Sequence, residues 1–357
     1  NVDLIVSDEG YGANAYIETD KPIVVVTGPG PGSGKLATAL GNLYHEYRKG
    51  NRAGYAKFET FPVWDLPLDH LVNTAYEAAT ADLRDVNMID PYHLKAYGKI
   101  VVNYNRDIEA FGLLKKILEK ITEGASVYQS PTDMGVNRIS AGIIDDEVCQ
   151  KAAYQEIIRR HLQSFVEYAM GRTGKDTVER TTEIMRKVGA KDEDRRVVEP
   201  ARNAAKEAES CGKGYAGIYC GAAIELHDGT IVTGKNSPLL HASSSMILNA
   251  TKHLAGLPDN MILLPENIID SVTHLKKDIL NGKNVSLDVE ETLIALSISA
   301  ISNPAAQIAL QKLTELHNCE MHSTHIPTPG DEAGLRKLKV NVTCDPVFSS
   351  KRLFVSE

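Results

Sequence analysis

The sequence is poor in features that would place the protein in an oxidising compartment. Its five cysteines, Cys149, Cys211, Cys220, Cys319 and Cys344, are odd in number and lie far apart. None of them forms the Cys-x-x-Cys pair that zinc and redox sites use. This cysteine usage predicts a reducing, cytoplasmic location and gives no disulfide framework.

An excess of positive charge is also missing. The chain contains 39 Lys and Arg residues against 47 Asp and Glu residues, which gives a net charge of −8. It has no basic stripe with interleaved aromatic residues, so the sequence argues against a DNA or RNA partner. A small anionic ligand is compatible with this charge, because local geometry is enough to bind it.

Long apolar runs are absent as well. The most apolar stretches, residues 23–26, 216–224 and 293–301, are shorter than the roughly 20 residues that cross a bilayer, and no secretory signal is visible. We therefore expect no membrane partner. Because the chain starts at Asn1 without an initiator methionine, we expect it to be part of a longer protein.

The 357 residues are enough for two or three domains. Short apolar runs alternating with helical patterns predict an α/β fold with a P-loop-like or Rossmann-like parallel sheet in residues 1–145. Amphipathic patterns predict a helical subdomain at 146–210, and a second α/β domain follows at 211–357. Strands are predicted at residues 4–7, 23–27, 54–58, 86–89, 100–102, 217–226, 230–233, 261–264, 319–325 and 340–344.

A glycine-rich segment lies between the predicted strand at 23–27 and a predicted helix that begins at Lys35. Successive backbone N–H groups of such a turn point toward one anion, and the positive end of the helix dipole adds attraction. We therefore predict a phosphate site made by Gly28, Gly30, Gly32, Ser33, Gly34 and Lys35.

This segment approximates the Walker A pattern, with three departures. Gly28 is one residue too far from Gly34 and Lys35, Pro29 stands at the expected first glycine, and Leu36 replaces the Ser or Thr that ligates magnesium. ATP or another nucleotide is the expected ligand. The use of magnesium is in doubt.

A dinucleotide fingerprint, Gly32-x-Gly34-x-x-Ala37, overlaps the same segment, and Glu59 ends the next strand where a ribose-binding carboxylate would lie. A structural turn is a third reading. Lys35 favours the phosphate cradle, because a lysine in the turn reaches terminal phosphates but has no required role in a dinucleotide site.

Asp90, Arg106 and Asp107 follow predicted strands, at the end of a sheet where α/β proteins bind ligands. Arg106 and Lys35 are predicted to stabilise charge on a transferring phosphoryl group, and Asp107 to act as a metal ligand or base. Asp90 is the best-placed metal ligand by pattern. Helix capping is the alternative for Asp90 and Asp107.

Motifs along the chain closely resemble a bacterial family catalogued as domain of unknown function 1846, or uncharacterised protein family 0371. They include Lys57-Phe-Glu-Thr-Phe-Pro62, Val102-Asn-Tyr-Asn-Arg-Asp107 and Ser130-Pro-Thr-Asp-Met-Gly-Val-Asn137. The resemblance runs over almost the whole length. It implies a substantial further N-terminal region and assigns no activity.

The third region resembles, more distantly, the cytidine deaminase fold: a hairpin over residues 222–233, a helix from Ser243, a strand, and a helix opened by Asn303-Pro304. Deaminases hold zinc with Cys or His residues at the starts of the two helices and use a Glu for proton transfer. Here those places read Ser243-Ser-Ser245 and Asn303-Pro-Ala-Ala-Gln307, so we expect no zinc and no zinc-dependent deamination.

The first hypothesis is an enzyme, a transferase or hydrolase, that binds a nucleotide or another phosphorylated small molecule and performs phosphoryl-transfer or ATP-dependent chemistry. The alternatives are an NAD(P)- or FAD-binding protein and a non-catalytic ligand-binding or assembly protein. Homo-oligomer formation is expected.

Overall fold

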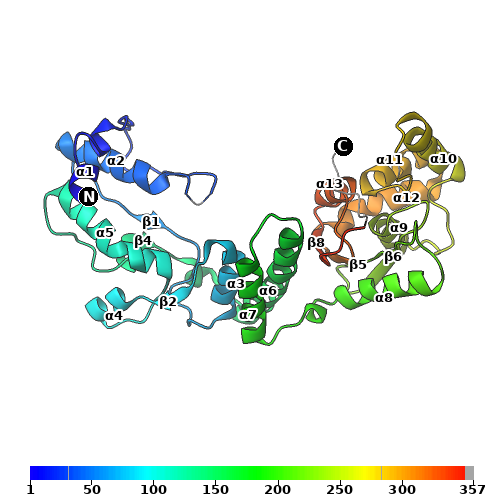
Figure 1. Cartoon of the computed structure of the whole chain (residues 1–357), viewed down its shortest axis with the longest axis horizontal. Helices are drawn as coiled ribbons and strands as arrows, with labels where there is room; N and C mark the ends of the chain where they lie inside the picture. Colours follow the sequence, from blue (N-terminus) through cyan, green and yellow to red (C-terminus); the bar gives the residue numbers. More distant parts are fainter. Residues whose placement is uncertain (31, 283, 350–357) are drawn as a thin grey trace. The chain divides into compact units, whose positions relative to one another are not determined.

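The computed structural model describes residues 1–30, 32–282 and 284–349, so Pro31 of the glycine-rich segment lies outside the described residues. The chain divides into two compact units, Asn1–Tyr154 and Gln155–Glu357, and each is described by itself (Figure 1). None of the helices in the described ranges is long and apolar enough to cross a membrane.

The core of the first unit lies between helices α1 (Val2–Ile5), α2 (Lys35–Arg48) and α5 (Asn105–Thr122), which Figure 1 draws close together. Helix α2 presents buried side chains three to four residues apart on one face, as an amphipathic helix must. They pack with buried side chains of α5, and the cluster includes Leu40, Leu43, Tyr44, Phe111, Leu118 and Ile121.

Short strand pairs complete the first unit. β1 (Lys57–Phe58) is parallel to β4 (Gly135–Val136), and β2 (Asn87–Ile89) is antiparallel to β3 (Val102–Tyr104). Helices α3 (Leu71–Ala79) and α4 (Pro91–Tyr97) lie before and after β2 in the chain. The fold is thus mixed α/β, with two-stranded sheets in this unit.

Two strand predictions for this unit are wrong. Residues 4–7 overlap α1, a helix whose N-cap Asn1 accepts a hydrogen bond from the Asp3 amide. Residues 23–27 form no strand within the described residues, and Ile23 and Val25 are 80% and 82% exposed. A short β-branched run is compatible with a strand, but it forms one only where a neighbouring strand supplies hydrogen bonds.

The helical patterns at the centre of the chain are confirmed as α6 (Asp146–Ala169), α7 (Lys175–Val188) and α8 (Val198–Ser210). In the second unit, Ile157, Ile158 and Leu162 of α6 are buried, as are Ile184 and Met185 of α7. The hydroxyls of Ser164 on α6 and Thr181 on α7 lie 2.7 Å apart and are both buried, which satisfies two polar groups inside this contact.

A four-stranded sheet with the order β6-β5-β7-β8 organises the second unit. β5 (Gly221–Glu225) pairs antiparallel with β6 (Ile231–Lys235) and with β7 (Glu320–Ser323), and β7 pairs parallel with β8 (Asn341–Cys344). The predicted hairpin is therefore confirmed, with Gly229 at φ 84° in its turn. Such a positive φ favours glycine.

Two glycines let helices approach this sheet closely. A Cβ at Gly221 would lie 2.1 Å from the Ala201 carbonyl oxygen of α8, and a Cβ at Gly234 would lie 2.2 Å from the Met246 amide nitrogen of α9 (Ala242–Leu254). Side chains alternate along a strand, so Ala222 and Ile224 of β5 pack with α9, while Ala223 packs with α8. The sheet is covered on both faces.

Side chains cap the starts of three of the remaining helices of the second unit, α11 (Val289–Ser299), α12 (Pro304–Gln311) and α13 (Pro329–Lys337). Asp288 caps α11 and Asn303 caps α12, while α10 (Glu266–His274) follows Pro265 and α13 follows Thr328. The strand predicted at 261–264 is wrong, since these residues form no strand. Leu263 and Leu264 are nevertheless buried in an apolar cluster with α10 to α12.

Candidate functional site

The glycine-rich segment is a tight turn that leads into α2. Gly32 and Gly34 have φ values of 71° and 86°, in the left-handed region that favours glycine. The turn folds back on itself, because a Cβ added to Gly28 would lie 2.4 Å from Ser33 Oγ. Gly30, Gly32 and Gly34 face open space, with no heavy atom within 4 Å of an added Cβ apart from chain neighbours.

No side chain caps the backbone N–H groups at the start of α2 within the described residues. Gly34 is the N-cap and, having no side chain, makes no side-chain capping hydrogen bond. Lys35 Nζ donates to the Gly30 carbonyl oxygen at 2.6 Å and to Ser33 Oγ at 3.2 Å, so the ammonium lies within the turn. An ammonium and uncapped amides at a helix start are the groups that bind anions.

A second cluster forms where β1 and β3 end. Lys57 Nζ lies 2.5 Å from Glu59 Oε1 and 2.6 Å from Asp107 Oδ2, and it also donates to the Tyr104 hydroxyl. Tyr104 OH donates to Glu59 Oε1 at 3.0 Å. One ammonium, two carboxylates and one phenol therefore share a single hydrogen-bonded group.

Burial tunes the acidity of this cluster. The Glu59 side chain is 8% exposed, and burial raises its pKa, while the neighbouring Lys57 ammonium opposes the shift and the Asp107 charge adds to it. Burial also raises the pKa of Tyr104, and the negative charges of Glu59 and Asp107 raise it further. A buried carboxyl group with a raised pKa beside a lysine is a candidate for donating and accepting protons.

Arg106 lies beside this cluster but is held by a different carboxylate. Its Nε and Nη2 atoms lie 2.5 and 2.8 Å from the two oxygens of Asp85, which is fully buried. Its guanidinium carbon is 5.4 Å from the Tyr104 ring centroid. Tyr76 OH also donates to Asp85, at 3.2 Å. The bidentate pair fixes the orientation of Arg106, whose side chain is 46% exposed.

Asp90 caps helix α4, the alternative that the sequence left open. Its Oδ1 accepts hydrogen bonds from the amides of Tyr92 and His93, at 2.9 and 3.0 Å. Its Oδ2 accepts a hydrogen bond from Thr132 Oγ1 at 2.7 Å, and the residue is fully buried. These hydrogen bonds explain why Asp90 is buried without a metal ion, and metal ligation by Asp90 stays a prediction.

The structure brings three of the predicted site residues, Glu59, Arg106 and Asp107, around Tyr104. Lys35 makes its hydrogen bonds within its own turn, and no hydrogen bond or ion pair between described residues joins that turn to the cluster. Sequence reasoning missed Lys57 and Tyr104. The signal for Lys57 was its spacing of two from Glu59, which places both side chains on one face of an extended segment.

Ser244 and Asn303, at the helix starts that the sequence analysis compared with deaminases, have structural partners. Ser244 is fully buried and donates to the Leu287 carbonyl oxygen at 3.0 Å. Asn303 Oδ1 accepts hydrogen bonds from the amides of Ala305 and Ala306, at 3.0 and 3.4 Å, as an N-cap does. Ser245 is half-buried beside a cavity described below.

Two family models match the chain end to end. The first is described as "Domain of unknown function DUF1846, N-terminal" and covers residues 1–189. The second is described as "Domain of unknown function DUF1846, C-terminal" and covers residues 193–354. The chain belongs to the DUF1846 family. The resemblance that the motifs indicated is therefore confirmed.

Curated relatives of this DUF1846 member carry the name UPF0371 protein. One from Clostridium botulinum strain Langeland is 55% identical over 355 residues, which cover 99% of this chain and 70% of the relative. One from Fusobacterium nucleatum is 54% identical over 360 residues, which cover 100% of this chain and 71% of the relative. One from Clostridium tetani is 54% identical over 355 residues, with 99% and 70% covered.

Proposed function

We propose that the first unit binds a small phosphorylated molecule on the glycine-rich turn. The observation that carries this proposal is the position of the Lys35 ammonium, 2.6 Å from the Gly30 carbonyl oxygen, directly before uncapped amides of α2. A phosphate at this place accepts hydrogen bonds from the amides and from Lys35 together. The helix is 14 residues long, so its dipole adds to the attraction.

A nucleotide phosphate fits this proposal better than a dinucleotide. In the dinucleotide reading the Glu59 carboxylate binds ribose hydroxyls. Here Glu59 Oε1 is already engaged by Lys57 at 2.5 Å and by Tyr104 at 3.0 Å, and the side chain is 8% exposed. Glu59 therefore has little surface to offer a ribose. ATP, ADP or a phosphorylated metabolite is the ligand class that we propose.

We assign the acid–base chemistry of the proposed enzyme to the cluster of Lys57, Glu59, Tyr104 and Asp107. Glu59 has a pKa raised by burial, so it retains a proton to higher pH than an ordinary carboxyl group. Lys57 holds positive charge between two carboxylates, and Arg106 presents a half-exposed guanidinium next to them. Such an arrangement supports proton transfer with stabilisation of negative charge.

The test of phosphate binding is a calorimetric titration of the whole chain with ATP, ADP, NAD and inorganic phosphate. Lys35→Ala is expected to weaken binding of the phosphate ligands about tenfold or more, since a charge-assisted hydrogen bond to phosphate is worth about 1.5–3 kcal/mol. Lys99→Ala is the matched control, because Lys99 is exposed and its substitution removes the same charge from the same unit. Equal affinities of the Lys35 variant and the unsubstituted chain would reject the assignment.

A further inference from the structure

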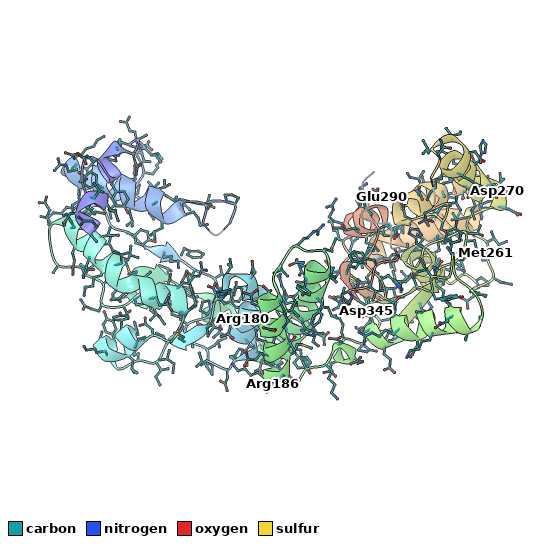
Figure 2. All side chains as sticks on the ribbon, viewed as in Figure 1. Arg180, Arg186, Met261, Asp270, Glu290 and Asp345 are labelled. Carbon is teal, nitrogen blue, oxygen red and sulfur yellow. The ribbon has the colours of Figure 1, made fainter. Side chains whose placement is uncertain are left out.

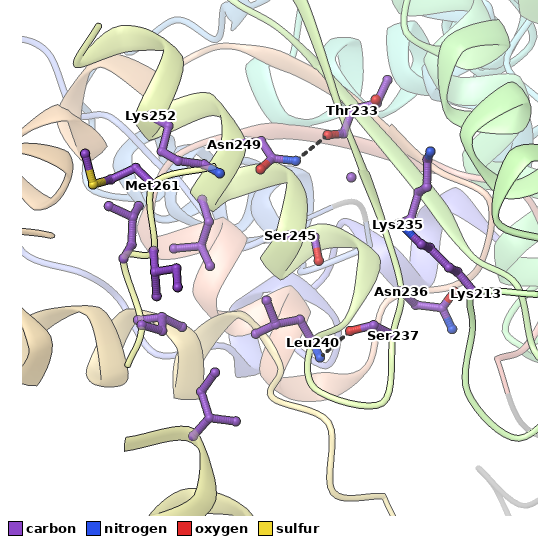
Figure 3. Close-up of a pocket in the computed structure, with 16 residues that line it drawn as sticks. Lys213, Thr233, Lys235, Asn236, Ser237, Leu240, Ser245, Asn249, Lys252 and Met261 are labelled. Carbon is purple, nitrogen blue, oxygen red and sulfur yellow. Dashed lines mark hydrogen bonds between the residues drawn. The ribbon is translucent and has the colours of Figure 1, made fainter. Parts of the chain in front are cut away.

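A cavity of about 500 Å³ opens in the second unit between β6, α9 and the segment that precedes α10 (Figure 3). Its volume lies within the range of about 300–1,000 Å³ that is usual for small-molecule sites. It belongs to neither the glycine-rich turn nor the Lys57 cluster. Three lysines line it, and its lining contains no Asp, Glu, His or aromatic residue.

One side of the cavity is cationic. Figure 3 shows Lys213 and Lys235 next to each other there, with Asn236 and Ser237. Lys235 forms an ion pair with Glu207 of α8, which is 61% exposed and lies outside the lining. The Lys213 amide donates to the Ala208 carbonyl oxygen at 2.8 Å, but in the described part of the chain its ammonium makes no hydrogen bond or ion pair, and its charge acts together with that of Lys235 on Glu207. This side therefore keeps a positive charge that Glu207 does not balance.

The centre of the cavity offers hydrogen-bonding groups from α9. Asn249 Nδ2 donates to the Thr233 carbonyl oxygen at 3.0 Å, which leaves its Oδ1 available. Among the described residues, nothing hydrogen-bonds to the Ser245 hydroxyl, which Figure 3 shows between Asn249 and Ser237. The hydroxyl is a donor that lines the same cavity as Lys213 and Lys235.

Aliphatic side chains form the opposite wall. Leu248, Leu263, Leu264 and Ile269 are 4% to 8% exposed. Met261 and Ile262, at 39% and 69% exposed, continue this wall to the surface, and Figure 2 shows Met261 at the outside of the second unit. Without an aromatic ring to stack a base or a carboxylate to bind a ribose, the wall suits an aliphatic body.

Lys252 adds a buried cation to the same cavity. It is 9% exposed, and within the described residues its ammonium donates only to the Asp259 carbonyl oxygen, at 2.6 Å. A buried ammonium without a carboxylate partner is unfavourable, because the hydrogen bond replaces only part of the lost hydration. Lys252 adds to the positive charge of the lining, which favours an anionic over a cationic ligand.

We propose that this cavity binds a small organic anion with an aliphatic body, its carboxylate or phosphate group held by Lys213, Lys235 and Ser245. The aliphatic body lies along Leu248, Leu263 and Leu264, with its far end toward Met261. The proposal does not rest on phosphate binding at the glycine-rich turn, because the lining of the cavity comes entirely from the second unit.

The test is a calorimetric titration of the whole chain with octanoate, octyl phosphate, octanol and octylamine. We expect the two anions to bind and the alcohol and amine to bind at least about tenfold more weakly, since a hydrogen bond to a charged group contributes about 1.5–3 kcal/mol. The tighter of the two anions identifies the head group. Inorganic phosphate in the same buffer should not displace them, because it has no apolar body.

Variants then locate the site. Lys235→Met and Lys213→Met should each weaken octanoate and octyl phosphate binding about tenfold and leave thermal unfolding within a few degrees of the unsubstituted chain. Lys206→Met removes the same charge from an exposed position of α8 that is not part of the lining, and should have no effect. Absence of binding by both anions, equal binding of octanol and octanoate, or equal losses in Lys206→Met would each overturn the proposal.

Discussion

Lys57 and Glu59 are two residues apart, and the Lys57 ammonium nitrogen lies 2.5 Å from Glu59 Oε1. Side chains alternate along an extended chain, so residues 57 and 59 point to the same side of β1. The Glu59 amide also donates to the Val136 carbonyl oxygen at 3.0 Å, which continues the pairing with β4. Backbone pairing therefore fixes the spacing of the ion pair.

Replacing Lys57 by Met should destabilise the first unit. The change removes the cation and leaves Glu59, which is 8% exposed, and Asp107 close together. Because the ion pairs of Lys57 are partly buried, we expect a loss of about 2 kcal/mol in the free energy of unfolding. This loss lies between those typical of exposed and of buried ion pairs. Trp64, the single tryptophan, is buried in this unit and reports its unfolding in urea by fluorescence. Lys99→Met is the control, and an equal loss there would contradict the prediction.

The raised pKa of Glu59 predicts a pH dependence. Burial makes the folded chain hold this proton more tightly than the unfolded chain, whose carboxyl titrates near 4.5. The contribution of Glu59 to stability is therefore fully present below that value and is lost as pH rises through the folded pKa. Urea unfolding of Glu59→Gln and of the unsubstituted chain from pH 4 to 8, followed by Trp64 fluorescence, should show the variant gaining relative stability as pH rises. A constant difference would disprove this reading.

Helices could be predicted from the sequence because their signals repeat over many residues. Leu40, Leu43 and Tyr44 recur at helical spacing before Arg48, and the structure has α2 at Lys35–Arg48. Short apolar runs were a weaker guide to secondary structure, because a run of four residues has too few positions to show a period. Residues 4 and 5 end helix α1, and residues 261–264 bury two leucines without forming a strand, because burial of a few side chains does not require strand pairing.

The candidate site was predicted in part for a related reason. Glu59, Arg106 and Asp107 stood out because polar residues that follow strands mark the ligand-binding ends of sheets. Lys57 belongs to β1 and Tyr104 to β3, and such residues are common in strands, so neither indicated a functional site. Only the three-dimensional pairing reveals that they contact each other. Asp85 was missed because its partner Arg106 is 21 residues away.

The absence of zinc is a prediction that metal analysis of the purified chain checks. At the positions that the sequence analysis compared with deaminase zinc ligands, this chain has Ser243, Ser244 and Ser245 in the first turn of α9. It has Asn303 as the N-cap of α12. Neutral hydroxyl and amide groups are poor substitutes for thiolate and imidazole in a zinc site. We expect less than about 0.1 zinc per chain after gel filtration, on the basis of this ligand chemistry. One tightly held zinc per chain would show that other residues supply the ligands.

Nucleotide binding at the glycine-rich turn should depend little on magnesium. Leu36 is the second residue of α2, the place at which a P-loop presents a hydroxyl to the metal, and its side chain is 45% exposed. An apolar side chain there cannot coordinate a hard cation that requires oxygen ligands. We therefore expect the ATP affinity of this chain to change less than about twofold between buffers with magnesium and with EDTA.

Leu36→Thr is the variant that sharpens this test, because it supplies the missing hydroxyl without altering Lys35 or the glycines. A threonine at this position should introduce a magnesium-dependent gain in ATP affinity and leave inorganic phosphate binding unchanged, since phosphate uses the amides and Lys35. Lys35→Ala should weaken ATP with and without magnesium by the same factor. If the unsubstituted chain already binds ATP at least tenfold more tightly with magnesium, then carboxylates such as Asp107 complete a metal site of different geometry, and the prediction drawn from Leu36 is wrong.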